Sequence, residues 1–335
     1  MRIAIVSDAW LPQVNGVVRT LDTVRAKLIA AGHDVMVIGP DRFHTLPCPT
    51  YPEIRLALLP ARVVAGLLDD FAPDAIHIAT EGPLGIAARR YCLARGLDFT
   101  TSFHTKFAEY LHARTRFPVT WTYAWLRRFH AASQRIMVAT PSLESELTQH
   151  GFGRLARWSR GVDTTLFRPR ADGFTPALEL PRPVWLYVGR VAVEKNIGAF
   201  LALPLDGSKL VVGDGPQLAQ LKRRHPDVHF AGAQHGEALA RHYAAADVFV
   251  FPSRTDTFGL VLLEALAAGL PVAAYPVTGP RDVIDGAPVG CLDDDLATAA
   301  RGALGLSARA CRDHALSYSW DASAQQFLTN LARVG

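Results

Sequence analysis

Two carboxylates stand close together in the stretch Arg254–Ala274, which reads RTDTFGLVLLEALAAGLPVAA. The stretch follows an apolar run, Val248–Phe251, that is typical of a buried parallel strand, and it becomes helix-like near Phe258–Gly259. Asp256 and Glu264 are eight residues apart, a little over two helical turns, so we expect both carboxylates on roughly one side. Because the first amides of a helix carry a partial positive charge, the stretch predicts a site for a phosphate-bearing ligand at the C-terminal edge of a parallel sheet.

Two cations follow the strand expected at Val184–Val188, in the loop Gly189–Asn196, which reads GRVAVEKN. Arg190 and Lys195 are five residues apart around a tight turn, so both side chains can converge on one anion. A planar guanidinium fork together with an ammonium point charge suits a diphosphate. The alternative is a surface salt bridge to Glu194, which the position at the end of a strand makes the weaker interpretation.

Two loops in the first half of the chain are candidates for ligand contact. The loop Ser7–Gly16, reading SDAWLPQVNG, ends in Asn15 and Gly16, and this turn offers backbone amides to an anion at a helix N-terminus. An ordinary loop between a strand and a helix is an equally good interpretation. His104 directly follows a strand expected at Phe99–Thr101, so it should lie at the C-terminal edge of the sheet, where a functional role competes with the structural role usual for a single histidine.

Strand-like runs alternate with helical patterns from one end of the chain to the other. Strands are expected at Ile3–Val6, Asp34–Ile38, Ala75–Ile78, Phe99–Thr101, Ile136–Ala139, Val184–Val188, Lys209–Val212, Val228–Phe230, Val248–Phe251, Val272–Ala274 and Val289–Leu292. Helices are expected at Val17–Ala31, Gly85–Ala94, Leu143–His150 and Glu237–Asp247. The alternation pauses across Asp163–Pro183, where prolines predict a linker. The pattern predicts an α/β protein with two Rossmann-like domains that face each other across a cleft holding the active site.

Neither half carries the dinucleotide fingerprint G-x-G-x-x-G with its downstream acid, which argues against an NAD-dependent oxidoreductase. The segment Val212–Pro216, VGDGP, has two glycines after a strand, and nothing that follows completes the fingerprint. We therefore interpret Gly213 as part of a turn that lets another group approach closely.

Composition restricts the class of protein. The chain has 335 residues, of which 49% are hydrophobic and 20% charged, a globular profile long enough for two domains. No apolar run approaches the length of a membrane span, and a strand pattern begins at once, so we expect no signal peptide. The four cysteines lack metal-like or redox-like spacing and indicate reduced thiols in a cytoplasmic protein without a metal site.

Positive charge is concentrated in segment 106–135, although the net charge of the whole chain is only +4. Its basic residues are interleaved with aromatic ones and are Lys106, Arg114, Arg116, Arg127, Arg128 and Arg135. This combination favours an interfacial membrane surface. Nucleic acid is less favoured, because no nucleic-acid-binding module accompanies the charges. A solvated face over aromatics buried in the core of the first domain is the remaining interpretation.

Taken together and in this order, these motifs resemble the retaining glycosyltransferases of family 4, which have the GT-B architecture. The resemblance covers essentially the whole chain and rests on residues 7–20, 102–105, 160–169, 189–196 and 212–216 and on the stretch Arg254–Ala274. It implies an N-terminal acceptor-side domain at 1–165, a nucleotide-sugar-binding domain at 180–317 and a C-terminal helix at 318–335 that packs back on the first domain.

The resemblance also implies roles for single residues in the transfer of a sugar from a nucleotide diphosphate, without a metal or other cofactor. The implied catalytic residues are His104, Asp256, Arg190 and Lys195. The implied nucleotide-sugar ligands are Asn15, Gly16, Arg190, Lys195, Gly213, Asp256, Thr257, Phe258, Gly259, Leu260 and Glu264. In the family, Glu264 would hold the ribose, Asp256 with nearby amides would grip the sugar hydroxyls, and His104 would touch the sugar near the reacting carbon. Front-face attack, with the departing phosphate oxygen drawing the acceptor proton, is the mechanism favoured for the family.

Asp256 departs from the family pattern, which commonly has Glu at this position, so the donor sugar is open. The form TDTFG is similar to a branch with sulfoquinovosyl-, glucosyl- and mannosyl-transferring enzymes that act largely on lipids. We expect UDP-glucose or UDP-glucuronic acid as donor and a membrane lipid such as diacylglycerol as acceptor, with the enzyme held peripherally on the inner face of the membrane by segment 106–135. The alternatives are a GDP-mannose-dependent α-mannosyltransferase and a nucleotide-sugar-binding scaffold without activity. Lys106 is either a contact for an acidic sugar or, more simply, a surface lysine.

Overall fold

The computed structural model describes residues 1–13, 15–48, 51–169 and 179–334, without the side chains of 51–53, 113 and 114. The chain forms two compact units, one of Met1–Arg160 with Trp320–Gly335 and the other of Gly161–Ser319. The first unit breaks off at Arg160 and resumes at Trp320, close to the expected 165 and 318, whereas the second unit begins at Gly161, well before the expected 180. Part of the expected linker is packed, since Phe167 is fully buried in the second unit, and residues 170–178 of that linker lie outside the described residues.

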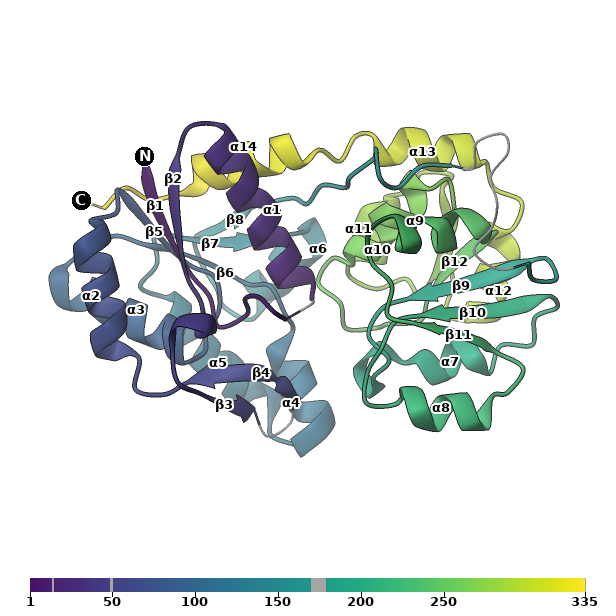
Figure 1. The fold of residues 1–335 in the computed structure, drawn as a ribbon, viewed down its shortest axis with the longest axis horizontal. Coiled ribbons are helices and arrows are strands. Elements are labelled where there is room, and N and C mark those ends of the chain that lie inside the picture. The colour runs from purple at the N-terminus through teal and green to yellow at the C-terminus, as the bar shows by residue number, and fades with distance from the viewer. Residues whose placement is uncertain (14, 49–50, 170–178, 335) are drawn as a thin grey trace. The chain divides into compact units, whose positions relative to one another are not determined.

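The first unit is built on a six-stranded parallel sheet in the order β2-β1-β5-β6-β7-β8 (Figure 1). Its strands are β1 Arg2–Val6, β2 Asp34–Ile38, β5 Ala75–Ile78, β6 Thr100–Ser102, β7 Arg135–Val138 and β8 Leu155–Arg157. Its helices are α1 Gly16–Ala30, the 3-10 helix η1 Pro40–Arg42, α2 Ala61–Phe71, α3 Pro83–Arg95, α4 Phe107–Thr115, α5 Val119–His130, α6 Pro141–Gln149 and α14 Trp320–Asn330.

Strand β1 shows why helices cover both faces of this sheet. Ile3 and Ile5 pack in a core with α1 and α14, whereas the alternate residues Ala4 and Val6 pack in a core with α2 and α3. Successive side chains of a strand point to opposite faces, so an uninterrupted apolar run can only be satisfied by burial on both sides. Figure 1 shows α14, from the end of the chain, beside α1 from its beginning.

A small antiparallel hairpin, β3 Thr45–Cys48 and β4 Tyr51–Ala57, follows η1 and was not expected from the sequence. It interrupts the strand–helix alternation between β2 and α2. The sequence of this run does not alternate cleanly between apolar and polar residues and contains three prolines, so it did not predict strands.

The second unit repeats the plan with the sheet order β11-β10-β9-β12-β13-β14. Its strands are β9 Val184–Val188, β10 Ser208–Val212, β11 His229–Gly232, β12 Val248–Phe251, β13 Val272–Ala274 and β14 Gly290–Leu292. Its helices are the 3-10 helix η2 Val193–Lys195, α7 Ile197–Leu201, α8 Leu218–Arg224, α9 Gly236–Ala245, α10 Leu260–Ala267, α11 Pro280–Ile284, α12 Leu296–Ala303 and α13 Ala308–Ala315. The predicted fold class, two parallel Rossmann-like sheets, is confirmed.

Each sheet has one point where the strand order reverses. In the second unit the chain moves from β9 outward to β10 and β11 and then returns to place β12 on the other side of β9. In the first unit the same reversal separates β1 from β5, since β2 lies on the opposite side of β1. The loops after the strands on either side of such a point diverge and leave room for a ligand. The fold therefore predicts ligand sites at the loops after β1 and β5 and at the loops after β9 and β12.

At Gly213 the loop after β10 approaches the loop after β9 very closely. The φ of Gly213 is +145°, and a Cβ added there would lie 1.9 Å from the carbonyl oxygen of Gly189 in the loop after β9. The turn that was expected to admit another group therefore admits the neighbouring backbone loop. Only glycine allows this contact, because any side chain would push the two loops apart.

We predict that Gly213→Ala lowers the free energy of unfolding by at least about 2 kcal/mol through backbone clash and strain. Gly198→Ala is the matched control, because Gly198 is an exposed position of helix α7 with nothing within 4 Å of an added Cβ. That control should be neutral or stabilise by up to about 1 kcal/mol. Urea unfolding followed by circular dichroism measures both changes, and equal midpoints for the two variants would contradict the close approach.

Candidate active site

The loops after β9 and β12 are joined by side chains at the point where the strand order of the second unit reverses. Lys195 forms an ion pair with Asp256 across the two loops. Asn196 Nδ2 donates to the carbonyl oxygen of Pro252 at 3.1 Å, and Thr255 Oγ1 donates to that of Glu194 at 3.3 Å. The predicted cation and the predicted carboxylate therefore lie together, held by contacts on either side of them.

Asp256 uses its two carboxylate oxygens differently. Oδ1 accepts from the Lys195 ammonium. Oδ2 is buried and has no hydrogen-bond partner among the described residues. The hydroxyl of Ser253, three residues earlier in the same loop, is also buried without a partner in that part of the chain. A buried polar atom without a partner costs free energy, so Oδ2 and the Ser253 hydroxyl are the atoms here best suited to meet a polar ligand.

Arg190 lies on the same loop as Lys195 but has a different neighbour. Its Nε is 3.7 Å from Glu194 Oε1, and the Glu194 side chain is only 4% exposed. The ion pair with Glu194 that was the weaker interpretation is thus present for Arg190, whereas Lys195 contacts Asp256 instead. The Tyr187 hydroxyl donates to the Arg190 carbonyl at 2.7 Å and fixes the backbone that carries this guanidinium.

Glu264 lies on α10, is 2% exposed and accepts a hydrogen bond of 2.9 Å from the fully buried Tyr243 hydroxyl of α9. Helix α10 begins at Leu260, after Gly259 at φ +85°. Asp256 belongs to the loop before α10, so helical periodicity does not relate its position to that of Glu264. Phe258 is buried and Thr257 partly exposed in that loop, next to the amides that open α10.

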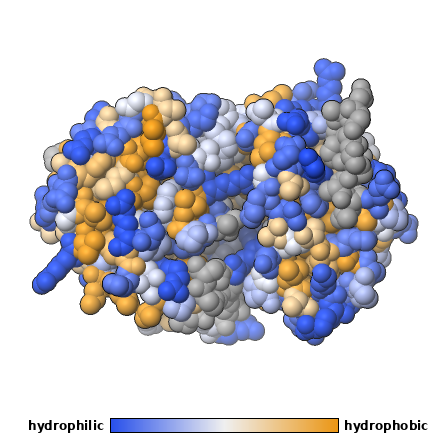
Figure 2. Space-filling model, viewed as in Figure 1, coloured by the Kyte–Doolittle hydropathy of each residue, from blue (hydrophilic) through white to orange (hydrophobic). Residues whose placement is uncertain are grey.

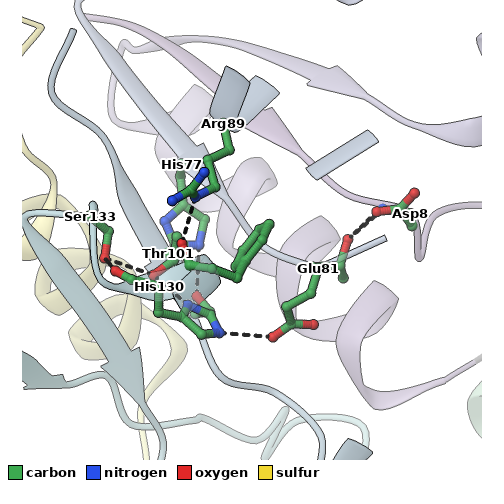
Figure 3. Close-up of polar contacts among 10 residues, drawn as sticks. Asp8, His77, Glu81, Arg89, Thr101, His130 and Ser133 are labelled. Atoms are coloured by element: carbon green, nitrogen blue, oxygen red, sulfur yellow. Dashed lines mark hydrogen bonds and ion pairs between the residues drawn. The ribbon is translucent and has the colours of Figure 1, made fainter. Parts of the chain in front are cut away.

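In the first unit the loops at the strand-order reversal are joined by Asp8, which the sequence analysis did not single out. Asp8, labelled in Figure 3, follows β1. Its carboxylate accepts from the amides of Leu84 and Gly85 at the start of α3 and from the Thr80 hydroxyl. Burial raises the pKa of Asp8, and these hydrogen bonds oppose the rise. A polar residue directly after a buried strand was the signal that could have revealed it.

Asn15 and Gly16 lie at the start of α1. Asn15 Oδ1 accepts from the amides of Val17 and Val18, both at 3.0 Å, so the side chain caps the helix. Two of the amides expected to meet an anion are already bonded within the chain. The neighbouring Val14 lies outside the described residues.

A buried polar network lies at the carboxyl ends of β5 and β6 and the end of α5 (Figure 3). His130 contacts Thr101 Oγ1 at 2.9 Å and Glu81 Oε1 at 3.2 Å, and Thr101 in turn donates to Ser133 Oγ. His77 bridges Thr100 and Ser102 on the neighbouring strand, and burial lowers its pKa to about 3. The network fixes the strand end from which the loop with His104 departs.

His104 itself contacts Arg160 and Trp158, two residues that the sequence analysis did not single out. Arg160 Nη2 lies 3.3 Å from His104 Nδ1, and the His104 ring meets the Trp158 ring edge-on at 5.5 Å. Trp158 also packs on Phe327 of α14, with 4.9 Å between ring centroids. The C-terminal helix therefore supports the ring stack on which His104 rests. Sequence separations of more than 50 residues made these contacts invisible to motif reading.

The basic and aromatic side chains of segment 106–135 divide into a buried and an exposed set. Tyr123 and Phe129 are buried in the core. Lys106 is also buried and pairs with Glu146 at 2.6 Å, so its interpretation as a surface lysine was wrong. Arg135 donates to carbonyl oxygens at the end of α14, and the side chain of Arg114 lies outside the described residues.

The exposed set lies on α4, α5 and the turn between them. It consists of Phe107, Phe117, Trp121 and Trp125, which are 43–71% exposed, with Arg116, Arg127 and Arg128. Figure 2 shows apolar side chains interspersed with hydrophilic ones on the surface of the first unit, including the side that Figure 1 labels α2 and α3. The surface with membrane-like composition is thus narrower than the whole segment.

The described residues contain neither a cluster of metal-ligating side chains nor a helix able to span a membrane. No three histidine, cysteine or acidic side chains of this part of the chain gather in a way that could hold a metal ion. Within the same residues, every helix is too short or too polar to cross a bilayer.

Comparisons with known proteins follow the two units. Residues 14–166 match the family described as Glycosyltransferase Family 4, and residues 182–307 match Glycosyl transferases group 1. A GDP-mannose-dependent alpha-mannosyltransferase of Mycolicibacterium smegmatis is 35% identical over 88% of this chain and 84% of its own length. An alpha-monoglucosyldiacylglycerol synthase of Acholeplasma laidlawii is 24% identical over 81% of this chain and 79% of its own length.

Among solved structures, a sucrose-phosphate synthase of Thermosynechococcus elongatus is similar to this chain with a TM-score of 0.79 and 22% identity. The similarity covers 98% of this chain and 97% of the other. At this level of identity the comparison bears on the fold alone, which is shared along nearly the full length of both proteins.

We predict that Lys195→Gln weakens the binding of GDP or UDP about ten- to hundredfold, since the lost charge-assisted contact is worth about 1.5–3 kcal/mol. The variant also leaves the Asp256 carboxylate uncompensated beside the ligand. Lys222→Gln, an exposed change on α8, is the matched control and should leave affinity unchanged. Isothermal titration calorimetry measures both, and equal affinities for the two variants would remove Lys195 from the site.

Proposed function

Because the chain belongs to glycosyltransferase family 4, whose members are retaining hexosyltransferases, we propose that it transfers mannose from GDP-mannose to a lipid acceptor. The observation that carries the donor is the 35% identity with a GDP-mannose-dependent mannosyltransferase over 88% of this chain. The UDP-sugar donors expected from the sequence are less well supported, since the relative with glucosyldiacylglycerol in its name is only 24% identical. The alternative donor of the sequence analysis is thus the preferred one.

The second unit supplies the groups proposed to hold the donor. Lys195 and Arg190 compensate the diphosphate charge together with the amides at the start of α10, near Phe258, Gly259 and Leu260. Glu264, held by Tyr243, accepts from the ribose hydroxyls. Thr257 and Gly213 belong to the surrounding loops and shape this site through the backbone.

Asp256 is proposed to bind the sugar. Its Oδ1 is occupied by Lys195, and its buried Oδ2 has no partner among the described residues, so Oδ2 is the oxygen that accepts from a sugar hydroxyl. A hydroxyl placed there relieves the cost of a buried acceptor, which favours donors whose hydroxyl points that way. Substrate selection at this position therefore depends on the orientation of one sugar hydroxyl.

The same contacts make a covalent role for either carboxylate unfavourable. The ion pair with Lys195 holds the Asp256 charge, and Glu264 is buried in a hydrogen bond with Tyr243. Both groups are suited to gripping hydroxyls rather than to attacking the anomeric carbon. This supports front-face transfer with retention, in which the departing phosphate oxygen takes the proton of the acceptor hydroxyl.

The first unit supplies the residues proposed for the acceptor side. His104 is the side chain with a role in the reaction, and Asn15 and Gly16 contribute the start of α1. Since the Asn15 side chain is used as a helix cap, its proposed contribution is to hold Gly16 in place. Small Gly16 then permits close approach of a ligand to the backbone.

We predict transfer of mannose from GDP-mannose to a membrane lipid extract by the purified chain, with little transfer from UDP-glucose or UDP-glucuronic acid. The measurement uses each donor with a radiolabelled sugar and identifies the lipid product and its anomeric configuration. Glu264→Ala should reduce turnover about a hundredfold through loss of preorganised ribose contacts. Asp313→Asn, an exposed change on α13, should leave turnover unchanged.

The outcomes separate the candidate functions. Transfer from a UDP-sugar in preference to GDP-mannose would restore the donor first expected from the sequence. Tight binding of GDP-mannose without transfer to any lipid or glycan would support the non-enzymatic scaffold. A β-linked product would overturn the retaining reaction.

We further propose that the exposed residues of α4 and α5 hold the protein peripherally on an anionic membrane. Trp121 is 71% exposed and Trp125 is 43% exposed on the same helix, while Arg128 extends from its last turn. Exposed indole rings beside arginines bind the headgroup region of anionic lipids. A lipid acceptor then becomes accessible without a spanning helix.

We predict that replacing Trp121 and Trp125 together by serine weakens binding to vesicles with phosphatidylglycerol tenfold or more, because two interfacial anchors are lost. The matched control replaces Leu59 and Val63, two exposed apolar residues near α2, and should leave binding unchanged. Arg128→Glu should weaken binding and reduce its dependence on salt. Vesicle sedimentation measures all three, and an effect of the control alone would place the membrane surface at α2.

A further inference from the structure

The guanidinium of Arg160 is held by contacts with two backbone carbonyl oxygens and one aromatic ring, in addition to its contact with His104. Arg160 is 4% exposed, and its Nη1 donates to the carbonyl oxygen of Trp158 at 2.6 Å and to that of Ser159 at 3.2 Å. Its charged centre lies 4.3 Å from the centroid of the Trp158 ring. These contacts leave Nη2 directed at His104 Nδ1, at 3.3 Å.

The direction of this hydrogen bond is dictated by the chemistry of the two groups. A guanidinium has only N–H donors and no acceptor. Burial lowers the pKa of Arg160 to about 9, which still leaves it protonated at neutral pH. His104 Nδ1 must therefore accept, and a neutral imidazole that accepts at Nδ1 carries its proton on Nε2.

The charged and titratable groups around His104 also keep the ring neutral. Burial, the charge of Arg160 and the proximity of His77 all lower the pKa of His104 well below its usual value. His77 has its own partners in Thr100 and Ser102. Among the described residues Arg160 forms no ion pair with a carboxylate, so an imidazolium at His104 would face an uncompensated guanidinium.

We propose that Arg160 is a positioning residue that holds His104 as the neutral imidazole with its proton on Nε2. In this state His104 meets a substrate oxygen as a hydrogen-bond donor and takes no proton from it. The consequence for transfer rests on the proposed function, because only then is that oxygen part of a sugar or phosphate. The tautomer itself follows from the contacts of Arg160 and is independent of the reaction.

The tautomer is measured directly on the full chain labelled with 15N-histidine, in long-range 1H–15N spectra that distinguish protonated from unprotonated ring nitrogens. The His104 signals are assigned by their loss in His104→Gln. We expect an unprotonated Nδ1 and a protonated Nε2, unchanged from about pH 6 to about pH 8, across the usual titration range of histidine. A protonated Nδ1, or a mixture of both tautomers, in the unaltered protein would overturn the proposal.

Arg160→Met keeps an apolar stem over Trp158 and removes every donor. We expect its His104 to populate both tautomers, whereas Arg160→Lys, which keeps a donor and the charge, should restore protonation on Nε2. An unchanged spectrum in Arg160→Met would overturn the proposal. If Arg160→Met does not fold, the spectrum of the unaltered protein still tests the proposal, because the wrong tautomer there is enough to overturn it.

Kinetics then separate this inference from the proposed function. Arg160→Met should lower kcat about tenfold or more and leave KM for the donor within about threefold, since the donor ligands lie in the second unit. Arg160→Lys should recover much of kcat. Absence of any transfer, together with the expected tautomer, would refute the proposed function and leave this inference standing. Transfer by a protein whose His104 carries its proton on Nδ1 would support the proposed function and refute this inference.

Discussion

Where the strand order of a parallel sheet reverses, the loops after the two neighbouring strands diverge, and in this protein side chains connect them. In the second unit the joining contact is the ion pair between Lys195 and Asp256, reinforced by the bonds from Asn196 to Pro252 and from Thr255 to Glu194. This has a functional consequence. Lys195, proposed to meet the diphosphate, is paired with Asp256, proposed to meet the sugar, so the ion pair restricts the movement of both side chains.

The first unit meets the same constraint with different chemistry. Its reversal lies between β1 and β5, and a single buried carboxylate, Asp8, joins the loops by accepting from Thr80 and from the first amides of α3. A lone anion at a helix N-terminus needs no cation partner, because the helix amides stabilise it. A buried cation of this unit, Arg160, lies elsewhere and contacts His104. One fold thus supports two charge arrangements with different tasks.

Sequence reasoning recovered what depends on neighbours along the chain. Apolar runs predicted most strands of both sheets, and the structure has His104, Lys195 and Asp256 in segments that follow strands, as expected for the carboxyl edge of a parallel sheet. It missed contacts between residues far apart in sequence, such as Tyr243 with Glu264 or Arg160 with His104. It also applied helical periodicity across a helix start, since α10 begins only at Leu260. Sequence motifs can therefore predict which strand end carries a side chain. Which side chains contact one another depends on how the elements pack.

Asp256 combines these points in one residue. The family commonly has Glu at this position, one methylene longer, yet here the shorter side chain is the one that forms the ion pair with Lys195 on the neighbouring loop. The departure from the family pattern therefore affects the connection between the two loops as well as the sugar contact. The proposed sugar contact and the observed contact between the loops depend on the same carboxylate, so a substitution of Asp256 is expected to change both.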